Sequence, residues 1–290
     1  SLSGKTTIAA ALGRRLSDGG ATVALSRLAG DANAAADARL LAGLAFNADR
    51  RPEPLQAPAL GGDADVSLVE APAGDPRSAL ASLSARAVVV VAYADPLPAG
   101  IPSFCEALGD ACAGVAITRV PVRRLEATRA AAAAIGVRLL GLIAEDRTLA
   151  APTLGAVAEA LEAGSSSLNS ASETVMDRPI ISSISADPAQ GYFARYGPNA
   201  VIVRGDKPDQ QLGALNAGAP CLIVTGGLPV LSYVEERAAD EGITVLRTRY
   251  DTVAAVERLE ALYGVTPFSG HAKVERIAEL AGELDISSLI

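Results

Sequence analysis

The first residues of the chain, SLSGKTT, contain a short run suited to binding phosphate. Glycine lets backbone N–H groups approach phosphate oxygens, lysine supplies a positive charge, and a threonine hydroxyl can ligate Mg²⁺. A helix that begins directly after the run adds aligned N–H dipoles at the same place. Gly4, Lys5, Thr6 and Thr7 are therefore candidate ligands of ATP or another nucleoside triphosphate, with Thr6 as the Mg²⁺ ligand.

The run is shorter than the pattern G-x-x-x-x-G-K-T, because only three residues precede Gly4. The opening glycine and the strand that should lead into the loop are absent from the printed sequence. A bare GKT also occurs where a helix begins beside an incidental lysine and threonine. The nucleotide site is favoured because an Asp-rich stretch, GDANAAADARLL, follows the second strand, and because the strand DVSLVE ends in an acid, Glu70.

Glu70 is the candidate for a second Mg²⁺-organising group. A carboxylate beside Mg²⁺ and triphosphate can hold the metal or orient a water molecule. The alternative is a strand-end carboxylate that faces solvent.

Rare residue types exclude other chemistry. A single histidine, His271, leaves no histidine cluster for a metal, and it stands in a polar connection unsuited to a Ser-His-Asp triad. Cys105, Cys112 and Cys221 lack C-x-x-C spacing, so we expect packing thiols rather than a zinc site.

Charge and hydropathy exclude further classes. The chain has 290 residues, 33 acidic and 25 basic, with a net charge of −8. This acidity argues against binding nucleic acid or an anionic membrane. The printed residues do not open with a basic segment followed by an apolar signal core, and no apolar run reaches about 18 residues. We therefore expect a cytoplasmic protein.

Strands and helices alternate along residues 1–163. Continuous apolar strands such as AVVVVAY (Ala87–Tyr93) are typical of a parallel sheet covered by helices on both faces. The pattern predicts a doubly wound α/β domain. Its expected helices are 7–16, 34–44 and 125–135, and its expected strands are 22–27, 65–70, 87–93, 114–118 and 139–143.

The composition changes after Ala163. A Ser-rich segment, residues 164–176, is expected to be a linker. A second, smaller α/β domain is expected over residues 177–290. Its expected strands are 200–203, 221–225 and 244–247, and its expected helices are 209–216, 230–240 and 253–263. The end of the chain shows an amphipathic helix over 272–284, with apolar residues at Val274, Ile277, Leu280, Ala281 and Leu284.

Turns at the carboxyl ends of the second domain's strands can meet at one edge of the sheet, where ligands bind in such folds. A Thr-Gly-Gly turn there exposes N–H groups suited to an anion. The alternative is that these residues are ordinary helix caps and tight turns. The domain shows no nucleophile–base pair, which favours sensing or assembly. The candidate regulatory ligand site consists of Gly205, Asp206, Asp209, Thr225, Gly226, Gly227, Asp251 and Thr252.

Longer stretches resemble a known arrangement. The pieces SGKTT, ADARLLAGL, DVSLVEAPAG, AVVVVAY and LLGLIAEDRTLAAPTLGAVAEAL resemble the dethiobiotin-synthetase-like P-loop domain that begins long-form phosphate acetyltransferases. The pieces GPNAVIVRGDKPDQQLGAL, CLIVTGGL and YDTVAAVERLEALYG resemble the DRTGG domain that follows it. The acetyltransferase domain has no counterpart, so the resemblance implies no synthesis of acetyl phosphate.

The sequence departs from dethiobiotin synthetases on the substrate side. Their lysine turn after the second strand is replaced by SRLAG, with Arg27 nearby. Their E-G-x-G-G stretch has become Glu70–Gly74, and their base-recognising asparagine has become Thr118. These changes weaken the expectation of carboxylation chemistry and of tight nucleotide binding.

The leading hypothesis is a regulatory or adaptor protein in which a nucleotide-binding P-loop domain is coupled to a DRTGG domain that senses a ligand or oligomerises. A small-molecule effector or a metabolic enzyme would be its partner. We expect a homodimer held mainly through residues 177–290, since two-fold dimers are the commonest assembly, and the resemblance implies an oligomer. One alternative is an ATP-dependent ligase of the dethiobiotin synthetase or cobyrinate-amidating type. Another is a structural dimerisation module with a vestigial nucleotide site. An enzyme activity would be at most that of a slow ATPase or of such a ligase.

Overall fold

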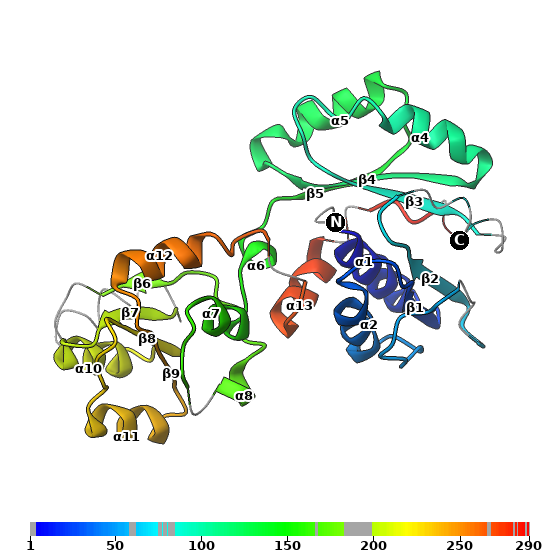
Figure 1. Cartoon of the computed structure of the whole chain (residues 1–290). Helices are drawn as coiled ribbons and strands as arrows, with labels where there is room; N and C mark the ends of the chain where they lie inside the picture. Colours follow the sequence, from blue (N-terminus) through cyan, green and yellow to red (C-terminus); the bar gives the residue numbers. More distant parts are fainter. Residues whose placement is uncertain are drawn as a thin grey trace. The chain divides into compact units, whose positions relative to one another are not determined.

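A computed structural model (Figure 1) describes residues 4–57, 62–74, 77, 80, 85–165, 168–182, 199–265, 268–280, 282, 284–287 and 289. The chain divides into two compact units. The first consists of Ser1–Asp146 with Val274–Ile290, and the second of Arg147–Lys273. Both alternate helices with parallel strands, which confirms the predicted α/β class with mainly parallel sheets.

The described part of the first unit contains every strand and helix predicted before residue 146, with small shifts at the ends, and it also contains helix α4. Its elements are α1 (Lys5–Asp18), β1 (Val23–Arg27), α2 (Ala34–Gly43), β2 (Val66–Glu70), β3 (Ala87–Ala92), α4 (Ile101–Leu108), β4 (Cys112–Val120), α5 (Leu125–Ala134) and β5 (Leu139–Ala144), with 3₁₀ turns at Gly109–Ala111 and Val122–Arg124.

The strands of the first unit form two groups among the described residues. β1 pairs with β2 in parallel, and β3, β4 and β5 form a three-stranded parallel sheet with β4 in the centre. In Figure 1, α4 and α5 cover one face of this sheet and α1 lies on the other side. The central strand carries the core, because Val115, Ile117 and Val120 pack with Ile101 and Leu142.

The second unit contains one four-stranded parallel sheet in the order β6-β7-β8-β9. Its elements are α6 (Arg147–Ala150), α7 (Leu154–Ala160), α8 (Leu168–Ala171), β6 (Ile180–Ile181), β7 (Val201–Arg204), α10 (Pro208–Asn216), β8 (Cys221–Thr225), α11 (Ser232–Asp240), β9 (Thr244–Arg247) and α12 (Thr252–Glu260). The last helix, α13 (His271–Leu280), continues into the first unit from Val274 onward.

Alternate residues of β7 and β8 pack into two separate hydrophobic cores, one on each face of the sheet. Val203 and Leu222 pack on the face that α10 and α11 cover. Ile202 and Ile223 pack on the opposite face with residues of α7 and α12. Because both faces are buried, the strands read as continuous apolar runs rather than as alternating ones. Cys221 is also buried there, in the packing role expected for it.

The compact units do not divide where the predicted domains divide. Helix α7 belongs to the second unit, because Leu154, Val157 and Leu161 pack in its core. The predicted linker, residues 164–176, also belongs there. Leu168 packs against the same core, and Leu168–Ala171 form helix α8.

The C-terminal residues, predicted to be part of the second domain, join the first unit instead. Arg276 Nε lies 2.8 Å from an oxygen of Asp146, and the amide of Asp285 donates to the carbonyl of Leu140 at 2.7 Å. The apolar stripe is buried at Ile277 and Leu284, while Ala281 lies outside the described residues.

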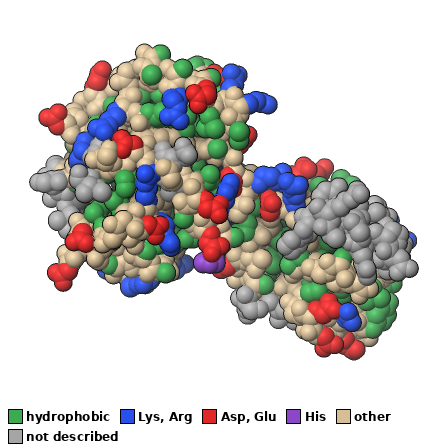
Figure 2. Space-filling view, turned by 180° about the vertical axis from the view of Figure 1, so that it is seen from behind, with side chains coloured by type: hydrophobic (Ala, Val, Ile, Leu, Met, Phe, Trp, Pro, Cys, Tyr) green, Lys and Arg blue, Asp and Glu red, His purple; other side chains and the backbone are tan. Residues whose placement is uncertain are grey.

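Two surface properties bear on the predicted classes. Basic and acidic side chains are interspersed on the face shown in Figure 2. None of the helices in the described parts of the chain has the length and apolarity needed to cross a membrane.

Candidate functional site

Helix α1 begins as a phosphate-binding helix should. Gly4 precedes it in the left-handed region, with φ 81° and ψ 25°, where a side chain would be strained. A Cβ at Gly4 would also lie 3.3 Å from the side chain of Thr118 on β4. No side chain in the described residues caps α1. The first N–H groups of a helix lack intrahelical partners, so this end of α1 favours an anion.

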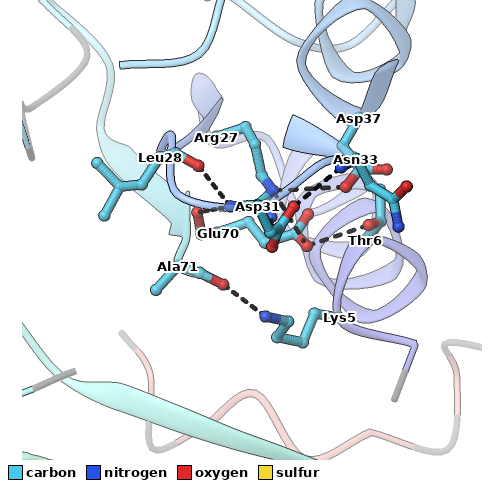
Figure 3. A network of polar contacts seen from close by, with 9 residues as sticks. All are labelled: Lys5, Thr6, Arg27, Leu28, Asp31, Asn33, Asp37, Glu70 and Ala71. Atoms are coloured by element: carbon cyan, nitrogen blue, oxygen red, sulfur yellow. Dashed lines mark hydrogen bonds and ion pairs between the residues drawn. The ribbon is translucent and has the colours of Figure 1, made fainter. Parts of the chain in front are cut away.

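Three predicted site residues come together where β2 ends. The ammonium of Lys5 donates to the carbonyl of Ala71 at 2.7 Å, and the hydroxyl of Thr6 donates to Glu70 Oε1 at 3.1 Å (Figure 3). Thr7 follows in the same turn of α1 and is half-buried. The helix therefore places a cation and a hydroxyl beside the carboxylate that ends the strand.

Glu70 is buried rather than facing solvent, which removes that alternative. It is 6% exposed, and its second oxygen, Oε2, is buried without a hydrogen-bond partner in the described structure. Burial raises the pKa of Glu70 to about 7, although the charge of Arg27 opposes the shift. A buried acceptor without a partner is costly, so a cation or a proton at Oε2 would stabilise this site.

Arg27 forms the centre of this site. It is 2% exposed, and its guanidinium lies 2.5 Å from Asp31, 3.4 Å from Asp37 and 3.5 Å from Glu70. Asp31 precedes α2 and Asp37 lies on its first turn. Figure 3 shows the three carboxylates surrounding Arg27 beside Thr6. The sequence pointed to the Asp-rich stretch without identifying these two residues as members of the site.

The charges in this cluster are nearly balanced. Arg27 and Lys5 face the carboxylates of Asp31, Asp37 and Glu70, which leaves one negative charge in excess when all are ionised. Burial lowers the pKa of Lys5, and the charge of Glu70 opposes that shift. Burial raises the pKa of Asp37. Burial also acts to raise the pKa of Asp31, but its hydrogen bond and ion pair with Arg27 outweigh that effect and lower it.

The cluster contains donors suited to Mg²⁺ bound together with phosphate. Mg²⁺ prefers oxygen ligands and usually takes only one or two carboxylates, with phosphate and water completing its shell. Thr6 Oγ1 and Glu70 Oε2 supply oxygens of this kind. Among the described residues, no group of three or more His, Cys, Asp or Glu side chains has the arrangement of a metal site.

In the second unit, three of the predicted site residues come together at the carboxyl edge of the sheet. The amide of Gly205, after β7, donates to the carbonyl of Thr225 at 2.9 Å. The hydroxyl of Thr225, which ends β8, lies 3.0 Å from the hydroxyl of Thr252, which begins α12. These groups satisfy one another within the fold.

The structure does not support an anion site at the Thr-Gly-Gly turn. Gly226 and Gly227 have φ of 92° and 70°, and their N–H groups donate to the carbonyls of Tyr250 and Thr248. The turn therefore ties β8 to the segment after β9, and its N–H groups are occupied by backbone acceptors.

The three predicted aspartates of this edge have separate positions. Asp251 caps α12, because its Oδ1 accepts from the amide of Ala254 at 2.8 Å. Asp206 forms an exposed ion pair with Arg204 at 2.6 Å. Asp209 lies exposed in the first turn of α10. The cap interpretation thus holds for Asp251.

Sequence reasoning missed Gln211, on the buried side of α10. It is fully buried, its amide nitrogen donates to the carbonyl of Arg204 at 3.0 Å, and its Oε1 is buried without a partner in the described structure. The dipeptide Gln210-Gln211 carries no signal that distinguishes the buried glutamine from the half-buried one. Gln211 and Glu70 are thus the two described residues with an unsatisfied buried side-chain oxygen.

Sequence reasoning also missed a cluster of polar contacts around Tyr250, on the segment after β9. Tyr250 donates its hydroxyl to Glu162, Arg249 lies 2.8 Å from the same carboxylate, and Arg258 stacks over the Tyr250 ring at 3.8 Å. This arrangement attaches the segment to the end of α7.

A solved structure to which this chain is similar contains the CBS and DRTGG domains of the regulatory region of Clostridium perfringens pyrophosphatase, complexed with its activator, diadenosine tetraphosphate. The similarity has 19% identity and a TM-score of 0.36, and it covers 43% of this chain and 54% of that one. This chain thus spans about half of that structure's length.

The family model of the DRTGG domain matches residues 156–262. The match begins within α7 and ends after α12, so it lies inside the second unit. The predicted domain is therefore present, but the match starts earlier and ends earlier than the predicted range of 177–290. Residues 156–262 of this chain are a DRTGG domain.

Proposed function

We propose that the chain is a nucleotide-responsive regulatory or adaptor protein. In this proposal, the first unit binds a nucleoside triphosphate such as ATP with Mg²⁺, and the DRTGG domain senses a small-molecule effector or mediates assembly with a metabolic enzyme. The observation that carries it is the buried Oε2 of Glu70, which has no partner in the described structure and lies beside Thr6 and Lys5 at the uncapped start of α1.

Each residue has a distinct task in this site. The N–H groups of α1 would bind phosphate oxygens, and Lys5 would move from the Ala71 carbonyl to the phosphates. Mg²⁺, when bound, neutralises phosphate charge. Thr6 and Glu70 would hold it, and Arg27 keeps Glu70 oriented. The resemblance to the P-loop domain of long-form phosphate acetyltransferases supports a regulatory use of such a site.

The structure favours regulation over the ligase alternative. A ligase of the dethiobiotin type needs a cation for its amino-acid-like substrate, and Arg27 is the nearest replacement for the missing lysine. Arg27 is 2% exposed and already faces Asp31 and Asp37, so it offers little to a substrate. The vestigial alternative does not account for an unsatisfied buried carboxylate at the helix start.

The DRTGG domain is proposed to carry a second ligand site at the carboxyl edge of its sheet, around Gly205, Gln211 and Thr225. The unsatisfied Oε1 of Gln211 supports this location. Adenine nucleotides are suitable first probes, including the diadenosine tetraphosphate named for the pyrophosphatase region.

Calorimetry with a panel of nucleotides, with and without Mg²⁺, tests the proposed function. Lys5→Ala should weaken ATP binding by at least about 2 kcal/mol, because a charge-assisted contact is lost. Arg39→Ala removes an exposed cation from α2 of the same unit and should leave affinity unchanged. Equal affinity of Lys5→Ala and the parent would refute the nucleotide site in the first unit.

We also propose a homodimer through the second unit, since two-fold dimers are the commonest assembly of such proteins. Leu228, Leu231 and Tyr233 are 46–49% exposed next to the Gly226-Gly227 turn. Leu231→Asp should shift the full chain from dimer to monomer in sedimentation velocity. Val122→Asp, at an exposed apolar residue of the first unit, should leave the dimer intact. A monomeric parent would contradict this proposal.

A further inference from the structure

Two non-glycine residues in the described part of the chain have a left-handed backbone, Arg119 with φ 59° and Glu162 with φ 47°. In this conformation Cβ crowds the neighbouring carbonyl oxygen, so a residue with a side chain is strained where glycine is not. Residues strained in this way cluster at functional sites. The contacts that each of the two side chains makes therefore bear on what it does.

The fold itself accounts for Glu162. Its carboxylate accepts a hydrogen bond from the hydroxyl of Tyr250 and lies 2.8 Å from Arg249. Glu162 also comes directly after the C-terminal cap of α7, where a left-handed residue commonly ends a helix. A side chain at this position is thus explained by contacts within the second unit.

Arg119 has no such explanation among the described residues. Its side chain is exposed, and it makes no hydrogen bond or ion pair with another residue that the structure describes. It lies within β4, the central strand of the β3-β4-β5 sheet, rather than in a turn. A partner outside the chain would explain why a cation occupies a strained position.

A bulge in β4 holds Arg119 in this conformation. The strand advances from Ile117 to Val120 while β5 advances only from Leu142 to Ala144, so β4 contains one extra residue here. The carbonyls on both sides of Arg119 accept hydrogen bonds of 2.8 Å from the amides that directly follow β3 and β5. Bulges are rare between parallel strands, and beside active sites they redirect a side chain.

The bulge lies next to the start of α1. Thr118, the neighbour of Arg119, has its side chain 3.3 Å from the position of a Cβ at Gly4, which precedes the uncapped N–H groups of α1. The buried Oε2 of Glu70, without a partner in the described structure, independently marks this end of α1 as a place for a ligand. Arginine fits phosphate oxygens with a planar fork of donors.

We propose that Arg119 binds a phosphate group of the nucleotide at the start of α1. The contact is made from the end of β4, whereas Thr6 and Glu70 hold Mg²⁺ at the end of β2. The inference rests on the proposed nucleotide site and adds to it a residue that recognises the polyphosphate rather than the base or ribose.

Calorimetry on the full chain tests this contact with two probes, ATP with Mg²⁺ and inorganic triphosphate with Mg²⁺, at one ionic strength. Arg119→Gly should weaken binding of both probes by at least about tenfold, because a charge-assisted contact is lost. Arg119→Lys keeps the charge and should stay within about threefold of the parent chain. Arg129→Ala removes an exposed cation from α5 of the same unit and should leave both affinities unchanged.

Urea unfolding of nucleotide-free protein separates binding from a structural role. Glycine adopts the left-handed backbone without strain, so the unfolding midpoint of Arg119→Gly should not fall below that of Arg129→Ala. A lower midpoint, or failure of Arg119→Gly to fold, would show that the side chain supports the fold and would overturn the proposal.

The remaining outcomes are also distinct. Weaker binding of ATP with unchanged binding of triphosphate would assign Arg119 to the base or ribose and overturn the proposal. Equal losses for Arg119→Gly and Arg129→Ala would reflect net charge alone and overturn it too. Unchanged binding by Arg119→Gly beside weaker binding by Lys5→Ala would overturn it while the nucleotide site stands. A parent chain that binds neither probe would overturn both the nucleotide site and this inference.

Discussion

The polar groups at the start of α1 and those at the carboxyl edge of the DRTGG sheet differ in how far the protein itself satisfies them. At the first, Glu70 is buried with one oxygen that has no partner in the described structure, in a cluster of two cations and three carboxylates. At the second, the backbone of Gly226 and Gly227 and the hydroxyls of Thr225 and Thr252 have partners within the fold, and the neutral Oε1 of Gln211 is the described buried side-chain oxygen there without one. A ligand gains most binding free energy where it supplies partners to buried polar groups that lack them. The comparison therefore favours the first region as the stronger binding site.

The largest effect is expected from removing the cation at the centre of the first region. Arg27→Met should destabilise the protein by about 3–5 kcal/mol, because it leaves buried carboxylates without their partner. Urea unfolding measures the change, and Arg39→Met on the exposed side of α2 is the control. A loss no larger than that of the control would mean that the cluster is solvated and that the contrast between the regions is smaller than inferred.

The pH dependence of the free energy of unfolding is a second property that distinguishes the first region. The pKa of Glu70 is raised from 4.5 to about 7 in the folded protein, so the folded state holds the proton more tightly than the unfolded state. Its contribution to stability therefore falls as pH rises from about 4.5 to about 7, by up to about 3 kcal/mol, and is flat above that range.

Glu70→Gln keeps the shape of the side chain and should remove this dependence. In nucleotide-free protein with a chelator, variant and parent should be equally stable near pH 4.5, and the variant more stable at pH 8. Glu53→Gln, at an exposed position, should leave the curve unchanged. If the free energy of unfolding of Glu70→Gln and of the parent changed in parallel with pH, burial would not disfavour ionisation of the Glu70 carboxylate.

The sequence indicated part of this contrast. Lysine, threonine and a strand-end acid have a known use in phosphate binding, so Lys5, Thr6 and Glu70 could be identified from type and spacing. Arg27 was seen only as a departure from a family pattern. Its role depends on β1, α2 and β2 converging to bury it, and burial of a charge leaves no local sequence signal.

The same reason explains what was mispredicted in the second region. Strand positions followed from apolar runs, and the DRTGG domain from its longer sequence pieces. The N–H groups of Gly226 and Gly227 have acceptors only because the segment after β9 brings the carbonyls of Thr248 and Tyr250 back to the turn. The segment 164–176 reads as polar, yet Leu168, Ala171 and Met176 pack against the core. Composition predicts a linker there, whereas the tertiary contacts make it part of a unit.

The smallest expected effect concerns Asp251, a predicted ligand residue that caps α12. Asp251→Ala should cost about 1 kcal/mol of stability, because the amide of Ala254 loses its side-chain acceptor. Asp251→Asn should retain most of it, since asparagine caps nearly as well. Asp206→Ala is the matched control at the other strand-to-helix turn, where an exposed ion pair with Arg204 contributes little. Urea unfolding of the three variants, together with titration of adenine nucleotides, distinguishes a structural from a binding role. If Asp251→Asn kept its stability but lost nucleotide affinity, Asp251 would be a ligand contact, and the second region would be as functional as the first.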